Sequence, residues 1–250
     1  MQIALKLLKK SNQYHMKKLF IVISTLSLLI SCEDKKPPNN LEITGYIKDL
    51  KKGTLYIKKI KDTSSIAVDT IQINGDAHFK SNIIVTAPEM YYLILDRGTT
   101  ISGDNSISFF AEPGKMSIES TLAFYSSDVK ITGSKNQALY DEYKKVANQF
   151  VDQNLDLVEA KFAAYQTKNN LELTKIQQKQ DAILKRRYLY TTNFAVNNGD
   201  YEVAPYITLA EISDINIKYL DTIQKRLSAK VAKSMYGKKL SALIVDRKKE

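Results

Sequence analysis

The stretch from Asp128 to Val146, DVKITGSKNQALYDEYKKV, divides the chain into two parts with different hydrophobic periods. Before Gly133, apolar residues alternate with polar ones, which is typical of half-buried strands. From Asn136 onward they recur every three or four residues, which is typical of one face of a helix. The sequence therefore predicts an α+β fold in which strands come first and helices follow.

Residues 41–133 are expected to form an antiparallel β-sandwich or barrel of about eight strands. Turn residues such as Asn74-Gly75-Asp76 and Pro113-Gly114 separate the apolar runs. No helical pattern intervenes, so the strands should pair with one another in one domain. The expected strands cover residues 41–47, 55–59, 66–71, 79–85, 90–95, 106–111, 115–119 and 128–131.

Residues 134–237 are expected to form antiparallel helices. A long helix should begin near Asn136, and a second should cover about 171–196. A short helix should start at Pro205, another should end near Gly237, and residues 238–250 should form a basic tail. The apolar residues expected to face inward are Leu139, Tyr143, Val146, Phe150, Leu155, Val158, Phe162 and Tyr165, then Ile176, Ile183, Leu184, Tyr188, Tyr190 and Phe194. Core packing accounts for these stripes, and a ligand groove is the alternative.

The N-terminal region has the order of a secretion signal. Residues 16–32, MKKLFIVISTLSLLISC, begin with Lys17 and Lys18 and continue with an apolar run. This run is too short to cross a bilayer core of about 30 Å as a helix. A small residue then precedes Cys32, as in a bacterial lipoprotein lipobox. The pattern favours a signal peptide over a permanent membrane span.

The resemblance to lipoprotein signals implies cleavage between Ser31 and Cys32 and attachment of lipid to the Cys32 thiol. Residues 1–31 are then the signal peptide, with translation starting at Met16, the second candidate start codon. Residues 32–40 are expected to be a lipidated tether because they are charged, contain proline and lack apolar periodicity.

A lipid anchor at Cys32 predicts that membrane lipid is a partner and that the protein resides in the cell envelope, at the outer membrane facing the periplasm. In some lipoproteins acidic residues after the lipidated cysteine steer export to the cell surface. Glu33 and Asp34 occupy those positions, but Lys35 and Lys36 follow them. A plain solvated tether is therefore the preferred interpretation, and surface exposure is the alternative.

Charge does not indicate a nucleic-acid partner. Five of the 37 lysines and arginines precede Cys32 and no acidic residue does, so loss of that segment lowers the formal charge from +10 to +5. The remaining bases form short clusters without the glycine and aromatic residues of a recognisable nucleic-acid module. Solvated surfaces explain these charges, and we expect no nucleic-acid binding.

The cysteine and histidine content argues against most catalytic sites. Cys32 is the only cysteine, so its lipidation would leave no disulfide, no C-x-x-C pair and no thiolate nucleophile. His78 is the only histidine after the signal, and it alternates with Phe79 as in a half-buried strand. A strand or turn position is therefore expected for His78, rather than a zinc site or a Ser-His-Asp triad. The sequence predicts a protein without enzymatic activity, cofactor or metal.

Several short motifs, taken in order, resemble one domain family. They are LEITGYI at 41–47, the Asn74-Gly75 turn between Ile71 and Phe79, Ala87-Pro88, FAEPG at 110–114, and ITGS at 131–134. With the lipobox, they resemble the domain of unknown function that precedes a thioredoxin-like, AhpC/TSA-type domain in many Bacteroidetes lipoproteins. The resemblance covers about residues 41–143, and the part up to residue 237 resembles the segment leading into the thioredoxin-like domain.

The resemblance implies that redox activity in such relatives belongs to a C-x-x-C site in the C-terminal domain, which this sequence to Glu250 is not expected to contain. We therefore expect a lipid-anchored, non-catalytic binding or scaffolding module with an envelope protein as partner. The alternative is an accessory partner of a separate thioredoxin-like thiol-disulfide oxidoreductase in the periplasm. A third interpretation is a degenerate relative that retains little function.

Overall fold

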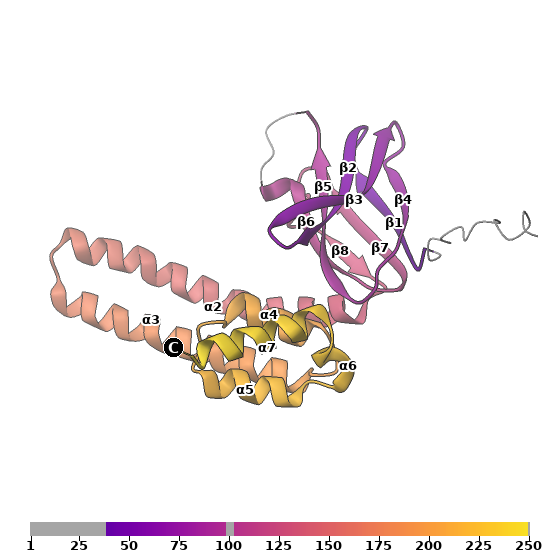
Figure 1. Cartoon of the computed structure of the whole chain (residues 1–250). Helices are drawn as coiled ribbons and strands as arrows, with labels where there is room; N and C mark the ends of the chain where they lie inside the picture. The colour runs from indigo at the N-terminus through magenta and orange to yellow at the C-terminus, as the bar shows by residue number, and fades with distance from the viewer. Residues whose placement is uncertain (1–38, 99–102, 250) are drawn as a thin grey trace, which may run out of the picture. The chain divides into compact units, whose positions relative to one another are not determined.

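The computed structural model describes residues 39–98 and 103–249, which belong to one compact unit (Figure 1). Eight strands come first and helices follow, which confirms the predicted α+β fold. The expected signal peptide, its cleavage site at Ser31 and Cys32, and the tether as far as residue 38 lie outside the described residues.

The eight strands form two four-stranded sheets, with strand orders β4-β1-β7-β8 and β3-β2-β5-β6. The strands are β1 (Leu41–Lys48), β2 (Lys52–Lys61), β3 (Ser64–Asn74), β4 (His78–Ile83), β5 (Glu89–Asp96), β6 (Ser106–Ala111), β7 (Gly114–Thr121) and β8 (Lys130–Thr132). In the described part of the chain the sheets do not close into a barrel, so the sandwich alternative is correct. The sheets are antiparallel-rich, as predicted, with a parallel pairing of β1 and β7 that the sequence did not indicate.

The strand core follows from the period of two. In β1, Leu41, Ile43, Gly45 and Ile47 are buried while the residues between them are partly or fully exposed. The three larger side chains join Ile57, Phe109 and other inward residues in one apolar cluster between the sheets. Burial of each such side chain stabilises the fold by roughly 1.5–3 kcal/mol, so in an alternating strand such as β1 the period of two fixes which face points inward.

The change from strand to helix occurs where the hydrophobic period changes. β8 ends at Thr132, and Gly133 adopts a φ of 93°, in the left-handed region that glycine tolerates best. A Cβ on Gly133 would lie 2.0 Å from the carbonyl oxygen of Lys115, so no larger residue fits this turn. Ser134 then caps the first helix by accepting a hydrogen bond from the Gln137 N–H.

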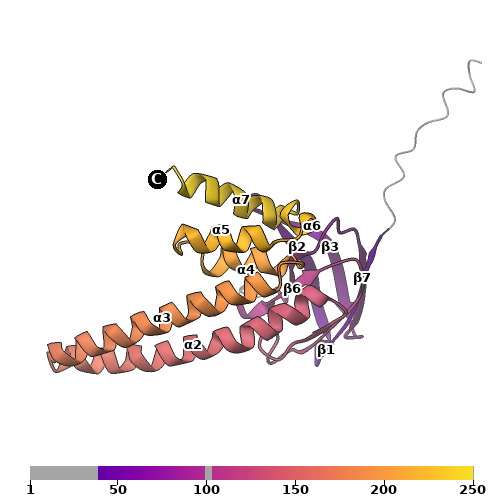
Figure 2. The same cartoon turned by 90° about the horizontal axis from the view of Figure 1, so that it is seen from below.

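Six helices follow Ser134. They are α2 (Lys135–Gln166), α3 (Asn170–Asn197), α4 (Val203–Glu211), α5 (Ile217–Arg226), α6 (Ala229–Ala232) and α7 (Met235–Arg247). In both views α2 and α3 run side by side and extend past α4, α5 and α7 (Figures 1 and 2). The predicted antiparallel helical region is therefore present.

The C-terminal end differs from the prediction. The helix expected to end near Gly237 is instead broken into α5 and α6, and α7 begins at Met235 with Ser234 as its cap. Residues 238–250 were expected to be a basic tail, but α7 continues to Arg247. The prediction was wrong because Leu240 and Ile244 continue an apolar face that is buried, while the lysines lie on the exposed face of the same helix.

The helices share a core with the outer side of one sheet. Phe110 of β6 is fully buried, and its ring meets those of Tyr140, Tyr206 and Tyr236 nearly edge-on, with centroids 5.7, 5.2 and 6.5 Å away. Its backbone N–H donates to Gln137 Oε1 at 2.8 Å. Polar side chains of the helices therefore satisfy strand groups that the sheet itself leaves unpaired.

Candidate functional site

α2 and α3 form a long antiparallel hairpin. Asn169 caps α3 by accepting from the Glu172 N–H, and Lys168 takes a φ of 53° to complete the reversal. Near the strands the seam between the helices is aromatic, with the rings of Tyr143 and Tyr190 stacked at 5.6 Å. Toward the tip it becomes polar, because Lys161 Nζ donates to the side chains of two α3 glutamines at 3.1 Å each.

A second apolar row on α2 does not face α3. It consists of Val151, Leu155, Val158, Phe162 and Tyr165, named here the distal stripe, and its members are spaced alternately by four and three residues. All five side chains are exposed; Leu155 and Tyr165 each keep 60% of their surface accessible and Phe162 keeps 65%. The described part of the chain therefore leaves this helical face without a covering element.

The distal stripe corrects the inward assignment of Leu155, Val158, Phe162 and Tyr165. The inward assignment of Leu139 and Tyr143 is confirmed, because both are buried. The remaining predicted inward residues divide into buried Ile176, Ile183 and Phe194, half-buried Val146, Phe150, Tyr188 and Tyr190, and exposed Leu184. The physical reason is that α2 carries two apolar rows one residue apart, about 100° around the helix, and spacing alone does not tell which row meets α3.

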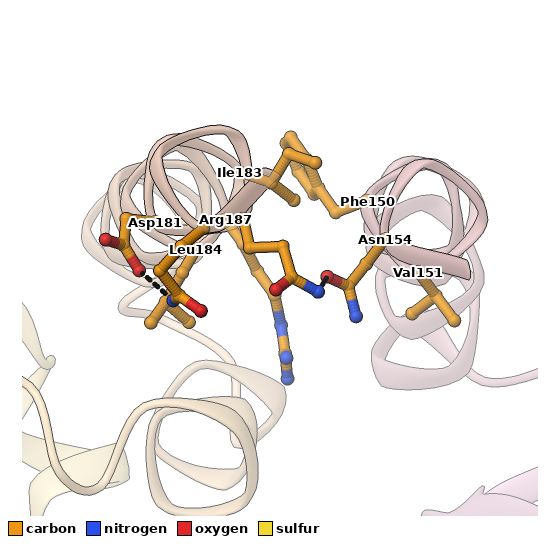
Figure 3. Close-up of a pocket in the computed structure, with 9 residues that line it drawn as sticks. Phe150, Val151, Asn154, Asp181, Ile183, Leu184 and Arg187 are labelled. Atoms are coloured by element: carbon orange, nitrogen blue, oxygen red, sulfur yellow. Dashed lines mark hydrogen bonds between the residues drawn. The ribbon is translucent and has the colours of Figure 1, made fainter. Parts of the chain in front are cut away.

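A groove of about 290 Å³ runs beside the seam on the side of the distal stripe (Figure 3). Val151 of α2 and Leu184 of α3 flank it, and Phe150 and Ile183 lie between the two helices. Its lining residues are Phe150, Val151, Asn154, Gln177, Gln180, Asp181, Ile183, Leu184 and Arg187. The distal stripe, Leu184 and this groove together are called the hairpin face.

The chain's own helices cover the hairpin nearer the strands. The rings of Tyr140 in α2 and Tyr206 in α4 meet edge-on at 5.8 Å. At the end of α4, Glu211 forms an ion pair with Arg187, which also lines the groove. The groove therefore begins where α4 ends, and its farther part is open.

The charged groups on the α2 edge of the hairpin face are acidic, whereas the α3 border carries both signs. Asp152 and Glu159 each follow a member of the distal stripe by one position, which places them on the edge of α2 away from α3. On the α3 side Asp181 lines the groove and accepts a hydrogen bond from Gln177 at 2.9 Å. Within residues 39–98 and 103–249, neither Asp152 nor Glu159 has an ion-pair or hydrogen-bond partner through its side chain.

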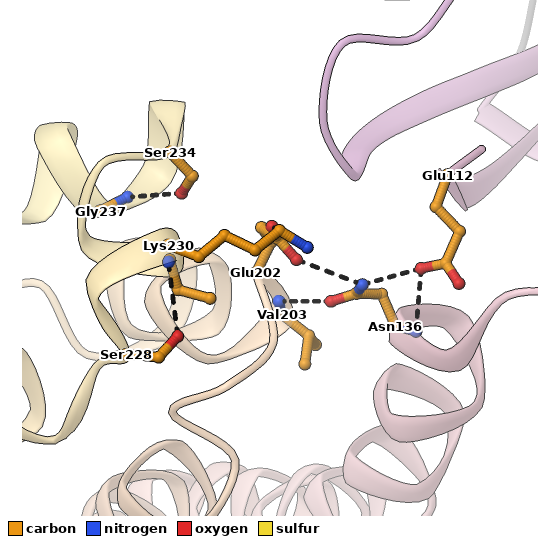
Figure 4. Close-up of polar contacts among 9 residues, drawn as sticks. Glu112, Asn136, Glu202, Val203, Ser228, Lys230, Ser234 and Gly237 are labelled. Carbon is orange, nitrogen blue, oxygen red and sulfur yellow. Dashed lines mark hydrogen bonds and ion pairs between the residues drawn. The ribbon is translucent and has the colours of Figure 1, made fainter. Parts of the chain in front are cut away.

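A buried polar network holds the root of the hairpin (Figure 4). The Asn136 side-chain amide donates to Glu112 Oε2 at 2.8 Å and to Glu202 Oε2 at 3.4 Å, and its oxygen accepts from the Val203 N–H at 2.9 Å. Glu112 also accepts from the Lys135 N–H at 2.8 Å. Carboxylates are favourable at this place because the N-terminus of α2 carries partial positive charge. The network joins α2, α4 and the turn after β6.

Glu202 is the most buried acidic residue of this network, with 2% of its side chain exposed. Its Oε1 has no hydrogen bond among the described residues, and the only cation near it is Lys230, whose Nζ lies 3.9 Å away. An incompletely satisfied buried carboxylate costs stability. The arrangement suits an electrostatic attachment of the start of α4 to Lys230.

The predicted site residues do not gather around the hairpin face. Cys32 and Ser31 lie outside the described residues. His78 begins β4 at an exposed position, with Nδ1 2.7 Å from Asp76 Oδ1. A hydrogen bond from the His78 backbone N–H is the main cause that lowers the pKa of Asp76. These contacts describe a surface turn, in agreement with the strand or turn position expected for His78.

Sequence reasoning missed Asn136, Glu202 and Tyr236, whose roles depend on partners far along the chain. Nothing in the local pattern around these residues indicates those partners. Across the described ranges, no cluster of three or more histidine, cysteine or acidic side chains is arranged to hold a metal. No helix in the same ranges combines the length and apolarity needed to span a membrane.

Comparison with known families gives one match. Residues 41–140 match the model described as Domain of unknown function (DUF4369). This segment contains all eight strands and only the first residues of α2, so it ends before the distal stripe begins at Val151. The match is consistent with the domain family expected from the motifs between residues 41 and 134. No curated protein matches the chain.

Proposed function

We propose that this protein is a lipid-anchored, non-catalytic binding module of the cell envelope and that it binds its partner through the hairpin face. The observation that carries the proposal is the exposure of the distal stripe. At roughly 200 Å² for each aromatic side chain, Phe162 and Tyr165 alone expose on the order of 250 Å². The exposed Val151, Leu155 and Val158 add to this area. Contiguous apolar patches larger than a few hundred Å² mark interaction sites.

The distal stripe does not serve the fold of the described residues. A helix of a globular protein normally buries one apolar row, and α2 already packs its other row against α3. Five further apolar residues at helical spacing increase the tendency to aggregate unless another molecule covers them. Binding explains why this second row is regular in spacing and apolar at every position.

The membrane anchor is inferred from the order of cationic, apolar and small residues before Cys32. A lipidated Cys32 would hold the sandwich near a membrane through residues 33–40, and the outer membrane facing the periplasm is the proposed location. The polar network of Asn136 would then fix the direction in which the hairpin leaves the sandwich.

The proposal is tested by photo-crosslinking in intact cells. A photoreactive phenylalanine analogue is placed at Phe162, and at Phe124 as the matched control, since these residues are 65% and 63% exposed. We expect a discrete crosslinked product from position 162 and none from position 124. Equal labelling at both positions, or none at either, contradicts a binding role of the hairpin face.

We propose one second candidate, an accessory partner of a separate thioredoxin-like oxidoreductase, from the motif resemblance with which the match of residues 41–140 is consistent. It is proposed because the resembling domains precede a thioredoxin-like domain in Bacteroidetes lipoproteins. Mass spectrometry of the product crosslinked at position 162 separates the candidates. A partner with a C-x-x-C site supports the accessory role, whereas a partner without one leaves the general binding function.

A further inference from the structure

The chemistry of the hairpin face also indicates what occupies it. Resting on the proposed binding function, we propose that the occupant is an amphipathic α-helix of another protein, with apolar residues at alternating spacings of three and four and with lysine or arginine along its edges. Three features of the described residues support this occupant.

The first feature is the geometry of the distal stripe. Intervals of four and three residues keep Val151, Leu155, Val158, Phe162 and Tyr165 on one nearly straight line along α2. Leu184 and the groove beside it provide a second, parallel border from α3. A surface made by two neighbouring helices with a groove between them receives a third helix, whose residues spaced by three and four enter the groove.

The second feature is that the chain already places a helix on this hairpin. α4 packs on α2 through Tyr140 and Tyr206 and on α3 through the Arg187–Glu211 ion pair. Because Arg187 also lines the groove, the open part continues the surface that α4 covers. A partner helix would therefore follow α4 along the hairpin and extend a packing mode that the fold uses.

The third feature is charge. Asp152 and Glu159 form one edge of the hairpin face and Asp181 lies on the other. Two of the nearby cations are already engaged, since Lys161 donates to Gln177 and Gln180 and Arg187 pairs with Glu211. Lys185, which follows Leu184, is exposed on the α3 border, so the acidic edge is that of α2. Basic residues on the edges of the occupant would pair with the carboxylates and set its identity and orientation.

The same charges disfavour two other occupants. In an antiparallel pair of two copies related by a two-fold axis, like edges meet, so Glu159 of one copy would approach Glu159 of the other. An anionic lipid surface would likewise repel Asp152 and Glu159. Self-association and membrane contact are therefore outcomes that would contradict the proposal.

The test uses the full-length protein and two synthetic 18-residue helical peptides. Both carry the same leucines at spacings of three and four, and their edge positions are lysine in one and glutamate in the other. Fluorescence anisotropy at about 0.15 M salt, where the screening length is near 8 Å, measures the affinity. We expect the lysine-edged peptide to bind at least about tenfold more tightly, a difference of about 1.4 kcal/mol.

Substitutions in the protein test whether the lysine-edged peptide binds at the hairpin face. Leu155→Gln with Phe162→Gln should abolish binding of the lysine-edged peptide, while Phe124→Gln, the matched exposed control, should leave it unchanged. Asp152→Lys with Glu159→Lys should reverse the preference toward the glutamate-edged peptide. Circular dichroism of each variant confirms that the helices are intact.

Equal affinity for the two peptides, or binding that survives the double glutamine change, overturns the proposal. Dimers in sedimentation analysis that the glutamine changes dissociate would assign the face to a second copy, and binding to anionic vesicles would assign it to lipid. These failures differ from failure of the proposed function. A crosslink at position 162 without a preference for basic edges leaves the binding function and removes only the helix described here.

Discussion

The backbone N–H of Met90 in β5 donates a hydrogen bond of 2.9 Å to the phenolic oxygen of Tyr236 in α7, although 146 residues separate them in sequence. Both residues are buried, so water does not replace this bond. The contact attaches the last helix to the sheet, and the Phe110–Gln137 bond attaches the first helix in the same manner. The hairpin thus projects from a support that is tied to the sandwich at two places.

Tyr236→Phe should destabilise the protein by about 1–3 kcal/mol, because the buried Met90 N–H would lose its acceptor. Urea unfolding should show a lower midpoint with an unchanged slope. Tyr165→Phe is the control, since that hydroxyl is exposed and has no hydrogen-bond partner in the described part of the chain. Equal midpoints for the two variants would show that the Met90 bond contributes nothing measurable.

Asn136→Ala should cost at least about 1.5–3 kcal/mol, because hydrogen bonds to two carboxylates and one from the Val203 N–H are lost together. Glu202 would keep its charge in a buried site with only Lys230 nearby. Asn148→Ala, at an exposed position of the same helix, should change the unfolding free energy by less than about 0.5 kcal/mol. Calorimetry of both variants is decisive, and similar melting temperatures would contradict a structural role of the network.

Alkaline pH should unfold the protein through its buried tyrosines. Burial raises the pKa of Tyr143 from 10.0 to about 12, and burial also raises the pKa of Tyr206 and Tyr236. The neutral phenols are favoured in the folded state, so this stability is complete below pH 10 and is lost as the pH rises toward 12. Unfolding free energies measured between pH 9 and 12 should fall, and Tyr143→Phe should make the fall shallower. A flat profile would contradict the burial of these hydroxyls.

Cys32→Ser should abolish acyl labelling and shift the protein from the membrane to soluble or unprocessed fractions, because the thiol is the expected lipid acceptor. Metabolic labelling with a fatty-acid analogue, followed by fractionation, measures both effects. Membrane retention of a cleaved Cys32→Ser protein at unchanged amounts would contradict the lipoprotein assignment.

The order of strands and helices was predictable because it depends on local periodicity. The change of period at Gly133 coincides with the end of β8 and the start of α2, and each expected strand overlaps an observed one. The parallel pairing of β1 with β7 was not predictable, since alternation within a strand does not specify its neighbour. The helical character of α7 was missed because its lysines suggested a tail, although Tyr236, Leu240 and Ile244 are four residues apart.

Only part of the candidate site could be predicted from the sequence. The spacing of Leu155, Val158 and Phe162 by three and four residues predicted a helix with these side chains on one face. It also predicted that this face makes contacts. It did not predict that solvent meets that surface, because the row of Val151 is apolar throughout whereas Asn154 and Lys161 interrupt the row of Phe150 that contacts α3. Burial depends on the position of α3, which only tertiary structure provides.

The unfolding free energy of the double variant Leu155→Gln and Phe162→Gln tests the central claim most directly, because glutamine has nearly the helix propensity of leucine. If the distal stripe serves binding and not folding, the free energy should stay within about 0.5 kcal/mol of the unmodified protein. Phe150→Ala, in the row that contacts Tyr190, should lower it clearly. A loss of about 2–5 kcal/mol in the double variant, as expected for core residues, would contradict the account.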